Sequence, residues 1–149
     1  MVKRIWLAED DSDDIDLFVE ALTDIDKSIV YNCARNGKEL IAKLNIGESD
    51  FPELIFLDVN MPEMNGWECL AYLKKNPTFK DIPVIIYSTS SAKTNTENAV
   101  ELGAFCFYEK PSNYTILREF LEIIVKSNLE KSNVIDNLAK GSRQKVYFN

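Results

Sequence analysis

The side chains in this sequence that could perform chemistry are carboxylates, hydroxyls and a lysine at the ends of short apolar runs. Glu9 and Asp10 follow the first run, and Asp58 directly follows another. Ser88 comes directly after a third, and Lys110 closes a fourth. Carboxylate oxygens favour a hard cation, while a lysine and a hydroxyl can receive an anion. If folding brings these groups together, they predict a phosphoryl-transfer site with an aspartate nucleophile.

The apolar runs that would position these groups have the character of strands alternating with helices. Four runs are strongly apolar and a fifth is more polar; they cover residues 4–8, 54–57, 84–87 and 105–108, with 29–33 as the weaker one. Helical spacing of apolar residues separates them, near 15–22, 37–44, 66–74, 94–102 and after Pro111. This alternation predicts the α/β class, with a parallel sheet covered by helices on both faces.

Five strands in this length suit a flavodoxin-like doubly wound sheet with strand order 2-1-3-4-5. Such sheets bind ligands beyond the carboxyl ends of strands 1 and 3, which would bring Glu9, Asp10 and Asp58 into one pocket. Carboxylates this close repel one another, and a divalent cation relieves the repulsion. A set of oxygens without Cys or His selects Mg²⁺, or Mn²⁺ in its place.

A simpler reading exists for the acidic cluster that starts at Glu9. Asp11, Asp13 and Asp14 can cap a helix and favour its positive end, and we interpret these three mainly in that way. For Glu9 and Asp10 both readings stay open. Asp58 is harder to explain as structure alone, because a lone aspartate after a buried strand is costly without a charged partner.

Composition excludes several classes of protein. The chain has 149 residues, 46% of them hydrophobic, which suits one globular domain, and its net charge of −7 argues against nucleic acid as a partner. With no histidine, Ser-His-Asp and Cys-His catalysis are excluded. Three scattered cysteines form neither a disulfide framework nor a CxxC site. We see no membrane span or signal peptide and expect a soluble, cytoplasmic protein.

Taken in order, these residues resemble the response-regulator receiver family of two-component signalling. The resemblance spans residues 3–128 and is carried by five pieces of sequence: Glu9-Asp10, LIFLDVNMPEMNG at 54–66, PVIIYST at 83–89, Gly103-Ala104 with Phe107, and Lys110-Pro111. It implies that Asp58 accepts a phosphoryl group from a histidine kinase or a phosphotransfer protein. It also implies a switch rather than an enzyme, with self-phosphorylation from small donors and self-dephosphorylation as its only reactions.

The resemblance assigns a role to each site residue. Asp10 and Asp58 would bind Mg²⁺ directly together with the backbone carbonyl of Asn60, and Glu9 would act largely through water. Lys110 would pair with the acyl phosphate.

Further residues would form the switch. Ser88 would move toward the phosphoryl oxygens and Phe107 would follow it inward, which changes the surface of helix 4, strand 5 and helix 5. Phe107 reads equally well as a core residue. The Lys110–Pro111 bond would be cis.

Three positions are expected to set reaction rates: Asn60, Thr89 and Ser90. Thr89 stands where the family prefers alanine or glycine, so its larger side chain should crowd the path to Asp58 and slow both phosphorylation and dephosphorylation.

We expect the receiver domain at residues 1–128 and a C-terminal extension at 129–149. The extension would be a flexible tail or hold one short helix, broken at Gly141-Ser142. The resemblance is to single-domain receivers, like the chemotaxis and phytochrome-associated regulators, which act by docking on a protein effector. Excess aromatic area at Phe105 and Tyr108 suggests a surface for a partner or for a homodimer.

Two other functions share parts of this pattern. A flavin-binding electron carrier has the same topology but needs a phosphate-binding loop after strand 1, where this chain is acidic. An Mg²⁺-dependent phosphatase with an aspartyl nucleophile needs a second carboxylate two residues later, where this chain has Asn60. A receiver that binds partners without phosphorylation is a third reading, which the complete set of motifs disfavours.

Overall fold

The chain folds into one sheet between two layers of helices, and a computed structural model describes residues 1–47, 50–140 and 143–148. The strands are β1 (Arg4–Ala8), β2 (Val30–Ala34), β3 (Leu54–Leu57), β4 (Val84–Ser88), β5 (Cys106–Glu109) and β6 (Val146–Tyr147). The helices are α1 (Ser12–Ile25), α2 (Gly37–Ile46), α3 (Gly66–Lys75), α4 (Lys93–Glu101), α5 (Tyr114–Lys126) and α6 (Lys131–Leu138). Within those residues, no helix is long and apolar enough to span a bilayer.

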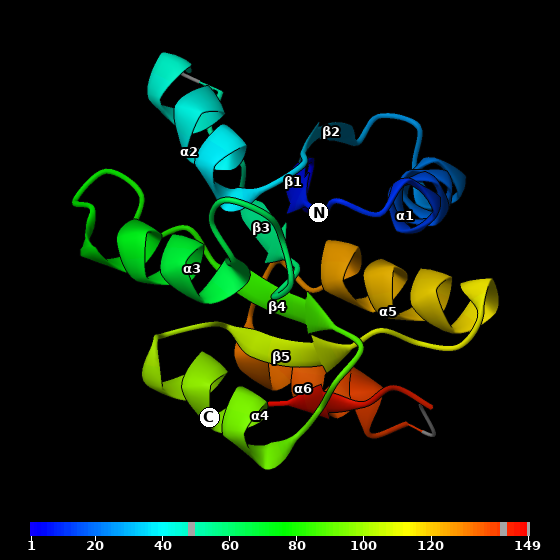
Figure 1. Cartoon of the computed structure of the whole chain (residues 1–149). Helices are drawn as coiled ribbons and strands as arrows, with labels where there is room; N and C mark the ends of the chain where they lie inside the picture. The colour runs from blue at the N-terminus through cyan, green and yellow to red at the C-terminus, as the bar shows by residue number, and fades with distance from the viewer. Residues whose placement is uncertain (48–49, 141–142, 149) are drawn as a thin grey trace.

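The sheet separates two hydrophobic cores, one under each layer of helices (Figure 1). Side chains of α1, α5 and α6 pack on one face, and those of α2, α3 and α4 pack on the other. Strands β3 and β4 lie in the middle and are buried along their whole length. This is why they read as continuous apolar runs rather than alternating ones.

The strand order is β2-β1-β3-β4-β5-β6, and all pairs are parallel except the last. The predicted α/β class, the flavodoxin-like order 2-1-3-4-5 and the helices on both faces are therefore confirmed. The polar run predicted as a weak strand is β2, an edge strand with Val30 and Tyr31 exposed. Edge strands face water on one side, which explains the weak signal.

The C-terminal segment holds more structure than the sequence predicts. Helix α6 corresponds to the predicted short helix, but β6 then pairs antiparallel with β5, with Phe107 opposite Tyr147. The sequence therefore predicted the short helix but not the strand. Two paired residues are too few for a periodic signal, and it is the open edge of β5 that selects them. The predicted break at Gly141-Ser142 lies outside the described residues.

This segment also covers the aromatic side chains that the sequence suggested as a partner surface. Tyr108 is fully buried, stacks on Phe120 and donates a hydrogen bond to Gln144 at 2.6 Å. The ring of Phe105 packs edge-on against Phe148, with 5.9 Å between ring centroids. Tyr108 is thus a core residue, and its interpretation as a docking residue was wrong because the tail supplies its partner within the same chain.

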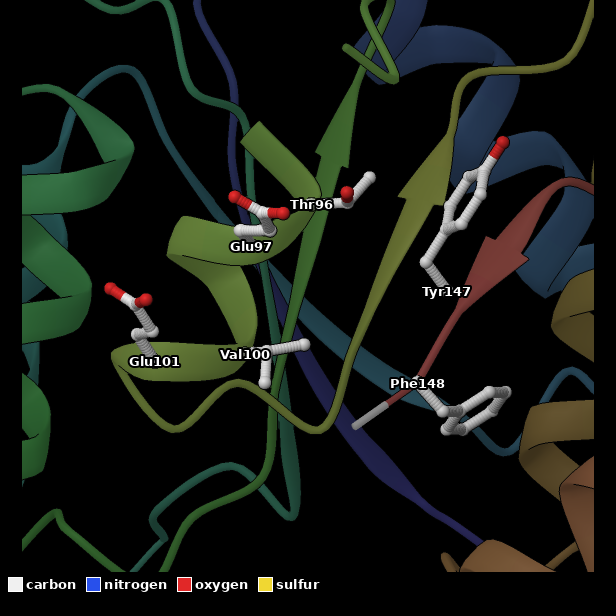
Figure 2. Close-up of a pocket in the computed structure, with 6 residues that line it drawn as sticks. All are labelled: Thr96, Glu97, Val100, Glu101, Tyr147 and Phe148. Atoms are coloured by element: carbon white, nitrogen blue, oxygen red, sulfur yellow. The ribbon is translucent and has the colours of Figure 1, made fainter. Parts of the chain in front are cut away.

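A hollow of about 300 Å³ lies between α4 and β6 (Figure 2). It is lined by Thr96, Glu97, Val100 and Glu101 of α4 and by Tyr147 and Phe148 of the tail. The tail therefore forms part of the surface around α4, β5 and α5.

Candidate functional site

The carboxyl ends of three neighbouring strands bring the acidic residues together. The amide of Glu9 donates to the carbonyl of Ala34 at 2.9 Å, and the amide of Asp58 donates to the carbonyl of Ala8 at 3.0 Å. These bonds extend the hydrogen bonding of β1 with β2 and of β3 with β1 beyond the strand ends. The side chains that follow each strand are therefore held at one edge of the sheet, at the switch point.

Glu9, Asp10 and Asp58 form a group of carboxylates that fits a metal ion. Each offers one oxygen, and the three oxygens lie within 4.8 Å of one another. Glu9 and Asp58 are buried, whereas Asp10 is exposed and opens the group to solvent. Oxygen ligands of this kind suit Mg²⁺ or Mn²⁺.

Lys110 lies against the buried side of this acidic group. The amide of Lys110 donates to the carbonyl of Ser88 at 2.7 Å, which ties the end of β5 to the end of β4. Its ammonium is 2.6 Å from Glu9 Oε2, 2.8 Å from Asp14 Oδ2 and 3.6 Å from Asp58 Oδ1. The same nitrogen lies 5.1 Å from the centroid of the Tyr87 ring, a cation–π contact.

Burial changes the proton affinity of these groups. It raises the pKa of Glu9 to about 7, although the hydrogen bond from Lys110 acts in the opposite direction. It also raises the pKa of Asp58, again opposed by Lys110. Burial alone would lower the pKa of Lys110, but its hydrogen bonds to Asp14 and Glu9 outweigh this and raise it. Lys110 is therefore a fixed cation beside two carboxyl groups whose pKa values burial raises.

Asp11 caps helix α1, whereas the side chain of Asp14 contacts the site. Asp11 is the N-cap of α1, as predicted, and its side chain accepts from the amides of Asp13 and Asp14. The sequence predicts that Asp14 belongs to the cap, but its carboxylate accepts a hydrogen bond from Lys110, 96 residues away. The signal that could have shown this is its place in the first helical turn after the strand-end acids, on the same edge of the sheet as Lys110.

The remaining predicted positions surround Asp58 at different depths. Ser88 is buried at the end of β4, and its hydroxyl lies 3.5 Å from the amide of Ser90. Thr89, Ser90 and Asn60 are exposed. Their predicted roles, in coordination by the Asn60 carbonyl and in setting rates, stay predictions.

Phe107 is fully buried on the α2–α3–α4 face of β5. The ring of Tyr147 packs against it, with 6.2 Å between the ring centroids. The ring is therefore already inward while Asp58 carries no phosphoryl group, and Tyr147 contacts it there. Its part in a switch stays a prediction.

The prediction of a cis Lys110–Pro111 bond is wrong, because no peptide bond between described residues is cis. The trans form is the intrinsically favoured isomer of X–Pro bonds. With this bond trans, the Lys110 side chain reaches Glu9 and Asp14.

Gly66 is a residue of the site that the sequence did not single out as one. A Cβ placed on it would lie 2.2 Å from the carbonyl oxygen of Asp58, far inside any real contact. Its amide donates to the carbonyl of Val59 at 3.0 Å. Only glycine lets the start of α3 approach the backbone after Asp58 this closely.

A doubly wound sheet with three carboxylates and a lysine at its switch point has the arrangement of a phosphoryl-accepting signalling domain. Residues 5–122 match the family described as the response regulator receiver domain. The chain belongs to this family.

Similar proteins agree with this. Response regulator Rcp1 of Synechocystis sp. is 35% identical over 134 residues, covering 86% of this chain and 90% of Rcp1. The crystal structure of the phosphorylated cyanobacterial phytochrome response regulator RcpA aligns with a TM-score of 0.76 and 35% identity, covering 83% of this chain and 91% of RcpA. The Mn²⁺-bound form of Rcp1 aligns with a TM-score of 0.76 and 29% identity, covering 84% and 96%.

Other relatives are much longer than the matched region. Against the protein-glutamate methylesterase/protein-glutamine glutaminase of Bacillus subtilis, the match covers 85% of this chain but only 36% of the relative. The region shared with these enzymes is the receiver domain alone.

Proposed function

We propose that the chain is a phosphorylation-dependent switch whose acceptor is Asp58 and whose donor is a histidine kinase or a phosphotransfer protein. The observation that carries the proposal is that Asp58 lies beside both Glu9 and Asp10 of the acidic group and the ammonium of Lys110, which is 3.6 Å from Asp58 Oδ1. A carboxylate with only one of these neighbours could be a structural ion pair.

The chain's own residues divide the transfer step among them. A carboxylate oxygen of Asp58 attacks the phosphorus, a P–O bond forms, and the bond from phosphorus to the donor nitrogen or oxygen breaks. Lys110 and the hydroxyl of Ser88 receive the charge on the phosphoryl oxygens. Glu9, Asp10, Asp58 and the Asn60 carbonyl would hold Mg²⁺, which supplies further positive charge to those oxygens when bound.

The signal would leave through the surface formed by α4, β5 and α5, which a protein effector would recognise. In the resting chain β6 lies along the edge of β5, so an effector would meet α4 and the tail before it meets β5. The hollow between α4 and β6 lies on this surface (Figure 2). The resemblance to the phytochrome response regulators suggests a photoreceptor kinase as donor.

The test is incubation of the full chain with Mg²⁺ and acetyl phosphate, followed by intact-mass measurement. We expect one added phosphoryl group in the wild type and in Asp13→Asn, a matched change on the exposed first turn of α1. We expect none in Asp58→Asn or in EDTA. An adduct retained by Asp58→Asn, or no adduct on the wild type with several small donors, would contradict the proposal.

A further inference from the structure

Asp14 is a carboxylate of the pocket that lies outside the acidic group. The cap on α1 sets its backbone, because Asp11 Oδ1 accepts from the amides of Asp13 at 2.9 Å and Asp14 at 3.0 Å. From there Asp14 Oδ2 accepts a hydrogen bond from Lys110 at 2.8 Å. A helix cap is thus coupled directly to the lysine of the site.

The ammonium of Lys110 lies between carboxylates that a metal ion would use and one that it would not. Glu9 and Asp58 belong with Asp10 to the group of oxygens within 4.8 Å of one another. Asp14 stands apart from that group and approaches the ammonium from α1. Its side chain is 33% exposed, against 1% for Glu9 and 8% for Asp58.

Lysine and metal ion compete for the same oxygens. A lysine ammonium has three N–H donors and no acceptor, so it is drawn to every carboxylate that it reaches. Each contact between Lys110 and Glu9 or Asp58 neutralises charge that would attract a divalent cation. The 2.6 Å contact with Glu9 Oε2 and the 2.8 Å contact with Asp14 Oδ2 use two of the three donors, and Lys110 stays 3.6 Å from Asp58, beyond a strong hydrogen bond.

We propose that Asp14 is a positioning residue that holds Lys110 toward α1 and so keeps the oxygens of Asp58 available to a divalent cation. The ammonium remains close enough to Asp58 to meet a phosphoryl group there. Without Asp14, Lys110 closes on Asp58 as well as on Glu9 and competes with the cation. The inference rests on the proposed function, since it concerns the cation and the lysine that phosphoryl transfer would use.

The test is a double-mutant cycle on metal binding alone, without any phosphoryl donor. Calorimetric titration with Mn²⁺, and then with Mg²⁺, compares the full chain with Asp14→Asn, Lys110→Met and the double variant. Asp13→Asn is the matched control, since it removes the same charge from the same helical turn, one residue away. We expect Asp14→Asn to weaken binding by about threefold to tenfold more than Asp13→Asn does. When each is combined with Lys110→Met, Asp14→Asn and Asp13→Asn should change the affinity for the cation equally.

An effect of Asp14→Asn that is the same with and without Lys110, or no larger than that of Asp13→Asn, would overturn the inference. Asp14→Ala repeats the cycle if the asparagine variant loses its far-ultraviolet circular dichroism. Parallel incubation with acetyl phosphate separates the two claims. If the cycle shows coupling between Asp14 and Lys110 but the wild type takes no phosphoryl group, the proposed function is wrong and the positioning role stands. If the wild type is phosphorylated but the cycle shows no coupling, only the positioning role is wrong.

Discussion

Glu9→Gln should change how the stability of the protein depends on pH, because it removes a buried carboxyl whose pKa burial raises to about 7. Glutamine has nearly the same size and shape, so the packing at the end of β1 is preserved. Lys110 keeps Asp14 and Asp58 as neighbours. The substitution therefore isolates the cost of ionising one side chain.

The sign and size follow from the two pKa values. The ordinary pKa of a glutamate side chain is 4.5, and the pKa of Glu9 in the folded chain is about 7. Between them the folded chain holds a proton that the unfolded chain has released, so this contribution to stability is complete below pH 4.5 and is lost as pH rises through 7. The difference between the two pKa values corresponds to roughly 3 kcal/mol over the whole titration, of which about 2 kcal/mol or slightly more is lost between pH 5 and pH 8.

Urea denaturation in EDTA between pH 5 and pH 8 measures the effect. We expect the free energy of unfolding of the wild type to fall by about 2 kcal/mol more than that of Glu9→Gln over this range. Glu20→Gln, an exposed change on α1, should follow the wild type. Parallel profiles for the wild type and Glu9→Gln would refute the reasoning that burial raises the pKa of Glu9.

Lys110→Met leaves Glu9 and Asp58 buried without their cation, so the unfolding free energy measured with urea in EDTA should fall by about 3 kcal/mol. Replacing the EDTA with Mg²⁺ should restore part of this loss. An unchanged unfolding free energy would argue against the ion pairs. Ending the chain at residue 142 removes the strand that covers β5 and should lower the unfolding free energy by about 2 kcal/mol, again measured in urea; full stability would show that the tail adds nothing. Thr89→Ala should speed phosphorylation by acetyl phosphate and subsequent loss of the group, both followed by intact mass, and rates equal to the wild type would count against a crowding role.

The sequence by itself determined the fold and the main carboxylates of the site. Strands β3 and β4 are covered on both faces, so their apolar runs are continuous and easily recognised. In a parallel sheet the carboxyl ends of adjacent strands share one edge. Knowing which residue follows each strand was therefore enough to bring Glu9, Asp10 and Asp58 together.

Contacts between distant segments were decided by the tertiary structure. Asp14 has the local features of a capping residue, and only the position of β5 relative to α1 shows that its side chain reaches Lys110. The strand at Val146–Tyr147 exists because β5 has an open edge, which two residues of sequence cannot indicate. The isomer of the Lys110–Pro111 bond, which is trans, likewise cannot be read from the sequence alone.

The physical reason for this division is the range of the interactions. Burial pattern and helix capping act over a few residues and leave a periodic trace in the sequence. The ammonium of Lys110 lies 2.6 Å from Glu9, 2.8 Å from Asp14 and 3.6 Å from Asp58, and all three residues are far from Lys110 along the chain. Contacts of this kind are made by side-chain reach and charge only after the strands and helices have been assembled.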